Sequence, residues 1–127
     1  MYKEYLNYDV ANDKEGVLQD VHWSHGSFGY FPTYSIGSFY AAQFFEKAMD
    51  DLPALKSDIR TGNMGNLKKW LNQNIHIHGR QFRAGELCEQ VTGEKLNLEY
   101  FMNYVRNKYA GLYPGLDEGE PAISRAE

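Results

Sequence analysis

The sequence has few of the features that most often reveal a function. Cys88 is the only cysteine among 127 residues, which excludes an internal disulfide. Adjacent basic residues occur only at Lys68-Lys69, and the net charge of -4 argues against a nucleic-acid partner. No stretch is long and apolar enough to cross a bilayer, and residues 1–5 lack the apolar core of a signal peptide. We therefore expect a cytoplasmic protein with no nucleic-acid or membrane partner.

The motifs of the common catalytic sites are missing as well. The sequence contains no HExxH, no paired thiolates and no glycine-rich phosphate loop. Cys88 lies in the apolar rhythm Leu87-Cys88-Val91, which is typical of a buried thiol and not of a nucleophile. The serines between residues 24 and 38 lack the strand-turn-helix frame of a serine nucleophile. None of these residues identifies a reaction.

What the sequence does contain is the hydrophobic spacing of helices. Between Thr33 and Leu52 apolar residues recur every four positions in two neighbouring rows, which predicts a helix that ends before Pro53. Small residues gather in its first half, where another backbone could approach closely: Gly37, Ser38, Ala41 and Ala42. We predict an all-α fold, a single helical domain of five or six helices over residues 1–116, and a disordered tail over residues 117–127.

The remaining predicted elements are short. Residues 1–8 have the spacing of the last turns of a longer helix. Asn97 is a plausible N-cap for a final helix that reaches residues 113–115. Residues 75–79 alternate apolar residues with histidine, so His76 and His78 would share a face if this segment is extended. Further helices are expected over residues 54–60, 64–74 and 82–91.

The stretch from Gly16 to Gln43 is the most unusual part of the chain, because it mixes large aromatic rings with polar groups and glycines. Asp20 and His22 are two residues apart, so an extended backbone points both the same way and the Asp can hold one tautomer of the imidazole. A buried structural Asp-His pair is the alternative. A third hypothesis is a small metal-binding protein that uses the four histidines: His22, His25, His76 and His78.

Several motifs occur together in a recognisable order. Residues 16–23 fit GxxQDxHW, residues 29–34 read GYFPTY, and residues 36–43 are similar to the helix opening LGNxxAAQ, with Ser38 in place of the usual Asn. Later segments fit the same series, at residues 75–79, 86–87, 92–94 and 108–113. From Met1 to about Leu116 the chain resembles the C-terminal end of the M32 family of metallocarboxypeptidases.

The resemblance implies a function that this chain holds only in part. M32 enzymes are helical, usually dimeric exopeptidases that use zinc or cobalt to release residues from the C-termini of peptides. Their HExxH, the following Glu motif and IRxxAD are absent here, so the resemblance implies a truncated segment without its own metal, inactive alone. It also implies that Tyr34, with Tyr30 as the second choice, donates its hydroxyl to the substrate's terminal carboxylate or to the developing oxyanion. The implied substrate-binding residues are Gln19, Asp20, His22, Trp23, Tyr30 and Tyr34.

A hypothesis of another class remains beside this one. The chain could be a stand-alone helical binding or oligomerisation module derived from the same scaffold. Cleft-wall residues separated from the rest of the enzyme would leave an apolar, tyrosine-rich face exposed, and such faces usually bind another molecule. The expected partners are therefore peptide C-termini in the complete enzyme, and either a second copy of this chain or an upstream catalytic segment.

Overall fold

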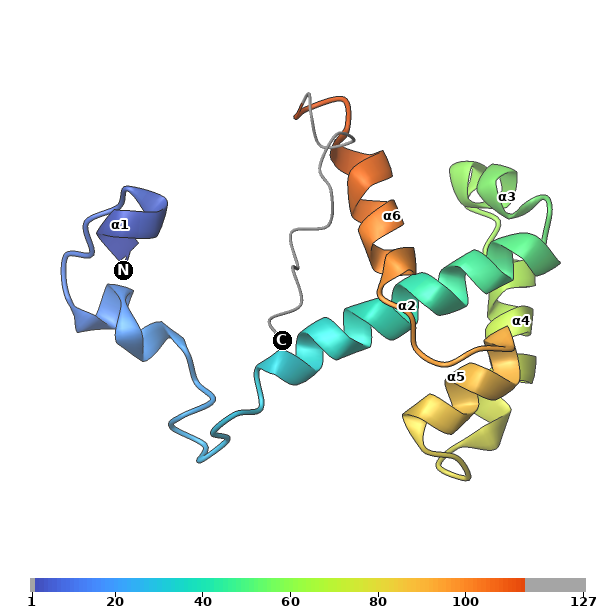
Figure 1. Cartoon of the computed structure of the whole chain (residues 1–127), viewed down its shortest axis with the longest axis horizontal. Coiled ribbons are helices and arrows are strands. Elements are labelled where there is room, and N and C mark those ends of the chain that lie inside the picture. Colours follow the sequence, from blue (N-terminus) through green and yellow to red (C-terminus); the bar gives the residue numbers. More distant parts are fainter. Residues whose placement is uncertain (1, 114–127) are drawn as a thin grey trace, which may run out of the picture. The chain divides into compact units, whose positions relative to one another are not determined.

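The computed structural model describes residues 2–113 (Figure 1). In these residues the chain is all-α, with six α-helices, three short 3-10 helices and no strand, which confirms the predicted fold class. The chain divides into two compact units, one ending at Ser35 and the other beginning at Ile36. The predicted domain boundary at residue 116 and the predicted tail lie outside the described residues.

The first unit is made of short elements joined by turns. It contains α1 (Tyr2–Leu6), η1 (Asp13–Glu15) and η2 (Val17–Gln19). Gly16 is its only buried residue among those described, and a Cβ at Gly16 would lie 2.8 Å from Val10 Cγ1. A larger residue between η1 and η2 would therefore require the Val10 side chain to move, which favours the glycine at the start of the unusual stretch.

The longest element is α2 (Pro32–Asp51), which the spacing predicted over residues 33–52. Its first residue is proline, which has no N–H to leave unpaired and already has a helical φ. The helix ends just before Leu52 and Pro53, as predicted. Within the described part of the chain, no helix combines the length and the apolarity needed to cross a membrane.

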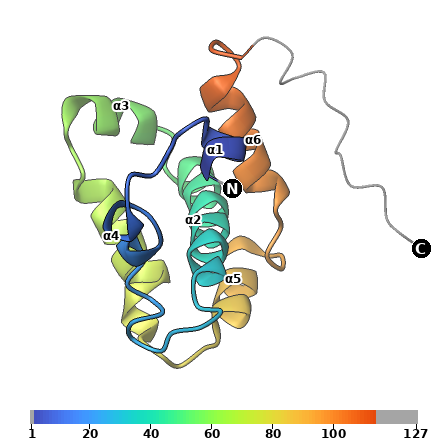
Figure 2. The same cartoon turned by 90° about the vertical axis from the view of Figure 1, so that its left-hand side faces the viewer.

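Four more helices complete the second unit. They are α3 (Leu55–Thr61), α4 (Gly65–Asn74), α5 (Ala84–Thr92) and α6 (Glu99–Tyr109). Figure 2 shows α3 and α4 on one side of α2, with α5 and α6 on the other. The central core is formed by Ala48 of α2, Leu55 of α3 and Trp70 of α4. Partly buried residues pack around it: Met49, Leu52, Ile59, Leu67, Leu71, Ile75 and Val91.

The structure differs at three places from what the local sequence patterns suggested. Residues 75–79 are not extended, because η3 (His76–His78) continues directly from α4 and the Ile75 N–H still bonds to the carbonyl of Leu71, at 2.9 Å. Packing of Ile75 against the core holds this segment close to the helix end. The final helix ends at Tyr109 and not at residues 113–115. Asn97 lies one position before its N-cap, yet its Oδ1 accepts the Glu99 N–H at 3.0 Å.

Candidate functional site

The candidate site lies in the first unit, between the end of η2 and the first turn of α2. Asp20 follows η2 with an extended backbone, at φ -82° and ψ 114°, and a tight turn then carries the chain through His22. At the other side, Thr33 donates its backbone N–H and its hydroxyl to the carbonyl of Tyr30, at 3.0 and 2.7 Å. These bonds fix the backbone at the start of α2 and therefore the direction in which the Tyr34 side chain points away from the helix.

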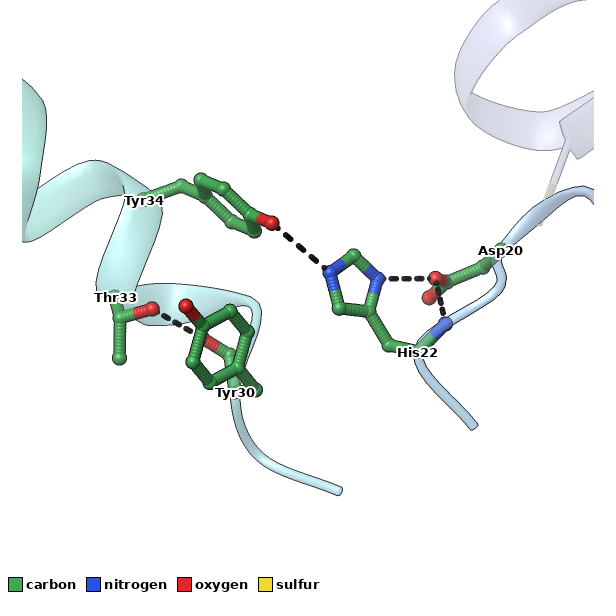
Figure 3. A network of polar contacts seen from close by, with 5 residues as sticks. All are labelled: Asp20, His22, Tyr30, Thr33 and Tyr34. Atoms are coloured by element: carbon green, nitrogen blue, oxygen red, sulfur yellow. Dashed lines mark hydrogen bonds and ion pairs between the residues drawn. The ribbon is translucent and has the colours of Figure 1, made fainter. Parts of the chain in front are cut away.

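Asp20 and His22 form the closest polar contact of the site (Figure 3). Asp20 Oδ1 accepts the backbone N–H of His22 at 3.0 Å and lies 2.5 Å from the ring Nδ1. The backbone hydrogen bond, followed by the bond from the ring, holds the pKa of Asp20 below its ordinary value. The carboxylate is therefore ionised at neutral pH, and because an ionised carboxylate only accepts, Nδ1 carries the hydrogen.

The far side of the imidazole meets aromatic side chains. His22 Nε2 lies 3.3 Å from the hydroxyl oxygen of Tyr34. The ring of Tyr30 stacks on the imidazole with centroids 5.8 Å apart, while Phe31 and Tyr34 meet it edge-on at 5.5 and 5.6 Å. The His22 side chain is 18% exposed and that of Asp20 is 45% exposed, so the pair lies at a surface and is not the buried pair of the alternative interpretation.

Two of the six predicted residues make other contacts. Gln19 turns back along its own segment, where Nε2 donates to the carbonyl of Lys14 at 2.5 Å. The exposed indole of Trp23 stacks on Phe28 with centroids 6.2 Å apart. The described structure therefore brings together four of the predicted site residues: Asp20, His22, Tyr30 and Tyr34.

Phe31 belongs to the same cluster and was not predicted as a site residue. Its ring lies 5.7 Å from that of Tyr34 as well as edge-on to His22. The signal was present in the sequence, because residues three apart at the start of a helix lie on one face. The spacing of Phe31 and Tyr34 across Pro32 could therefore have placed both rings together.

The described residues do not fit a bound zinc or cobalt ion. Within residues 2–113 no three His, Cys, Asp or Glu side chains lie close enough to hold a metal, whereas a zinc site takes three or four protein ligands. His76 Nδ1 lies 2.9 Å from Asn72 Oδ1, and His78 packs edge-on to Phe82 at 5.3 Å. These contacts give both histidines local structural roles and provide no support for the metal-binding hypothesis.

Comparison with known proteins shows to which class of protein the chain belongs. The model of the family described as carboxypeptidase Taq (M32) metallopeptidase matches residues 1–109. Among curated relatives, carboxypeptidase 1 of Bacillus subtilis is 43% identical over 112 residues, and thermostable carboxypeptidase 1 of Thermus thermophilus is 44% identical over 112 residues. Each alignment covers 88% of this chain and 22% of the relative. The class is thus that of the metallocarboxypeptidases.

Solved structures of M32 carboxypeptidases also share the fold of this chain. The M32 carboxypeptidase from Deinococcus radiodurans R1 superposes with a TM-score of 0.76 at 38% identity, covering 88% of this chain and 23% of the other. The Trypanosoma cruzi metallocarboxypeptidase 1 superposes with a TM-score of 0.75 at 42% identity, covering 85% and 23%. The chain belongs to the M32 carboxypeptidase family, and it spans about a fifth of the length of the relatives it matches.

Proposed function

We propose that this chain is the C-terminal segment of an M32 carboxypeptidase and forms a wall of its substrate cleft. The observation that carries the proposal is the line of contacts from the Asp20 carboxylate through the His22 imidazole to the Tyr34 hydroxyl. The Tyr34 end of this line is accessible, because the Tyr34 residue is 55% exposed. The site can therefore meet a ligand in the present geometry.

The chemistry of the cluster suits the end of a peptide. The substrate of a carboxypeptidase carries a terminal carboxylate, which only accepts hydrogen bonds. The Tyr34 hydroxyl and the His22 imidazole together can supply a donor to that group. The neighbouring rings of Tyr30 and Phe31 offer an apolar wall to the substrate's last side chain.

The proposal gives this chain peptide binding and not the hydrolytic step. The described residues bring no three metal ligands together, and the sequence contains no HExxH. The metal ligands and the catalytic Glu of the complete enzyme would come from other parts of it. We therefore expect the chain alone, supplied with zinc or cobalt, to release no residue from a blocked dipeptide, and robust turnover would contradict the proposal.

Binding can be tested with a matched pair of peptides. N-acetyl-alanyl-alanine carries a terminal carboxylate, and its amide differs only there. NMR titration of the chain should show shifts at His22 and Tyr34 with the acid and not with the amide. The variant Tyr34→Phe should weaken binding of the acid by about tenfold, because one hydrogen bond to a charged group is lost. Equal binding of acid and amide, or shifts confined to the second unit, would count against the assignment.

A second candidate function is supported by a groove in the second unit. This groove, of about 470 Å³, lies between α2 and α6, and its walls include Phe45 and Tyr104, which are 43% and 50% exposed. The residues that line it also include the small Ser38, Ala41 and Ala42. Small residues beside exposed rings can pack against the same surface of a second copy, as in a two-fold dimer. Sedimentation should then show a dimer, and a monomer at high concentration would remove this candidate.

A further inference from the structure

We propose that Asp20 acts through His22 to set the direction of the Tyr34 hydrogen bond, so that a carboxylate binding at Tyr34 brings a proton onto His22. The inference rests on the proposed function, because the ligand is the terminal carboxylate assigned there. It goes further in naming Asp20 as a positioning residue and in coupling ligand binding to a proton.

The first step is the tautomer of His22. Asp20 Oδ1 lies 2.5 Å from Nδ1 and also accepts the His22 backbone N–H at 3.0 Å, so the carboxylate is anchored on the residue that it orients. An ionised carboxylate has no hydrogen to give. In the neutral imidazole the single ring hydrogen is therefore on Nδ1, and Nε2 is left as an acceptor.

The second step is the bond to Tyr34. With His22 neutral, the Tyr34 hydroxyl donates to Nε2 across 3.3 Å and can offer a ligand only its oxygen lone pairs. With His22 protonated, Nε2–H donates to the hydroxyl oxygen, and the tyrosine hydrogen is turned toward the ligand. A carboxylate only accepts hydrogen bonds, so it selects the second arrangement.

The surroundings of the ring favour this exchange. Among the described residues, the titratable groups in contact with the imidazole are Asp20 after η2, Tyr30 before α2 and Tyr34 in the first turn of α2, with Phe31 as the apolar neighbour. Asp20 is the only charged group among them. A second carboxylate at Tyr34 would place the imidazole between two negative charges, which favours its charged form.

The consequence is a pH-dependent affinity for carboxylates. If only the protonated arrangement donates to the ligand, each binding event takes up a proton, so binding of the acid weakens as the pH rises, by up to about tenfold for each pH unit. The peptide amide should not gain binding at the cluster as the pH falls, because it carries no charge to select the protonated ring. The same coupling makes binding of the acid take up a proton from solution.

The tautomer is tested without any ligand. In the chain labelled with ¹⁵N-histidine, the ring nitrogens of neutral His22 should give a protonated Nδ1 and an unprotonated Nε2. Asp20→Asn should produce a mixture of tautomers, because an amide both donates and accepts, and Asp20→Glu should restore the native tautomer at least in part. As a control, His25→Gln removes the ring signals of His25 and should leave the ring signals of His22 unchanged. A native chain with the hydrogen on Nε2 overturns the inference even if the Asp20 variants fail to fold.

The coupling is tested with N-acetyl-alanyl-alanine and its amide. Calorimetry in buffers of different ionisation enthalpy counts the protons exchanged on binding. Where binding of the acid weakens as the pH rises, the acid should take up about one proton per peptide, and the amide, which does not bind at the cluster, should give no proton uptake. Binding of the acid at the cluster without proton uptake overturns the coupling and leaves the proposed function standing. Absence of any binding at the cluster overturns both.

Discussion

The buried side chain of Gln43 on α2 accepts the backbone N–H of Asn97 at 2.9 Å, across 54 positions of the sequence. Its Nε2 donates to Thr92 Oγ1 and to the carbonyl of Lys95, both at 3.1 Å. Gln43 is 1% exposed, so water cannot replace these hydrogen-bond partners. One amide thereby attaches the connection between α5 and α6 to α2.

Gln43→Ala is expected to destabilise the second unit strongly. The substitution leaves part-buried polar groups of the connection, among them the Asn97 N–H, without their partner, and such groups cost about 1–3 kcal/mol. We expect the free energy of unfolding to fall by about 2–3 kcal/mol, measured by urea denaturation. Gln90→Ala, on the exposed face of α5, is the matched control and should change it by less than about 0.5 kcal/mol. Equal effects of the two variants would contradict the role of Gln43.

The helices could be predicted from the sequence because their apolar spacing is a local property. The same spacing did not indicate Gln43, since a buried polar residue is recognised only when its partners are known. At the candidate site the contact of Asp20 with His22 spans two residues and was predictable from an extended backbone. The approach of Tyr34 to His22 spans 12 positions, and without the family resemblance no spacing rule would have placed them together.

Cys88 is expected to be unreactive in the folded chain. It is fully buried on α5, and burial, as the main cause, raises the pKa of its thiol. Since the thiolate is the reacting form, both effects slow attack on a disulfide reagent. The rate with a chromogenic disulfide near pH 8 should be at least about a hundredfold lower than in urea, because reaction has to wait for opening of the fold. Rapid labelling under native conditions would show that α5 does not stay packed.

Asp51 makes the stability of the second unit depend on pH in acid. Its carboxylate accepts hydrogen bonds from Lys47 Nζ at 2.6 Å and from Trp70 Nε1 at 2.9 Å. These bonds, that of Lys47 first, hold the pKa of Asp51 below 3.8, its ordinary value. The stabilisation is therefore complete above the pKa of the unfolded chain and is lost as the pH falls through the lower pKa of the folded chain.

The variant Asp51→Asn tests this dependence. Unfolding by urea, followed between about pH 6 and pH 2, should lose part of its acid sensitivity in the variant. The difference should stay below about 1 kcal/mol, because the Asp51 side chain is 37% exposed and water screens the pair. The control is Asp50→Asn, one residue earlier on the same helix and also exposed. It should leave unchanged the contribution of Asp51 to the pH dependence of the free energy of unfolding. A pH profile that Asp51→Asn leaves unchanged would contradict the assignment.

Two glycines with equally open surroundings should respond to alanine in opposite directions. Gly62 caps α3 with a φ of 76°, and its N–H bonds to the carbonyls of Asp58 and Ile59. A Cβ at Gly62 would meet nothing within 4 Å, so the cost of Gly62→Ala comes from the left-handed backbone alone, about 1 kcal/mol. Gly62→Asn should cost less, because asparagine tolerates this conformation better than alanine.

Gly37 lies inside α2 with an ordinary helical backbone, and a Cβ there also meets nothing within 4 Å. Gly37→Ala should therefore stabilise the chain by about 0.5–1 kcal/mol, since alanine loses less backbone entropy on folding. Urea denaturation of the two alanine variants measures both effects under the same conditions. Because steric space is equal at the two positions, changes of opposite sign in the free energy of unfolding would assign the difference to the backbone angle φ. A loss of stability in Gly37→Ala would instead mean that the first half of α2 does not tolerate even a methyl group.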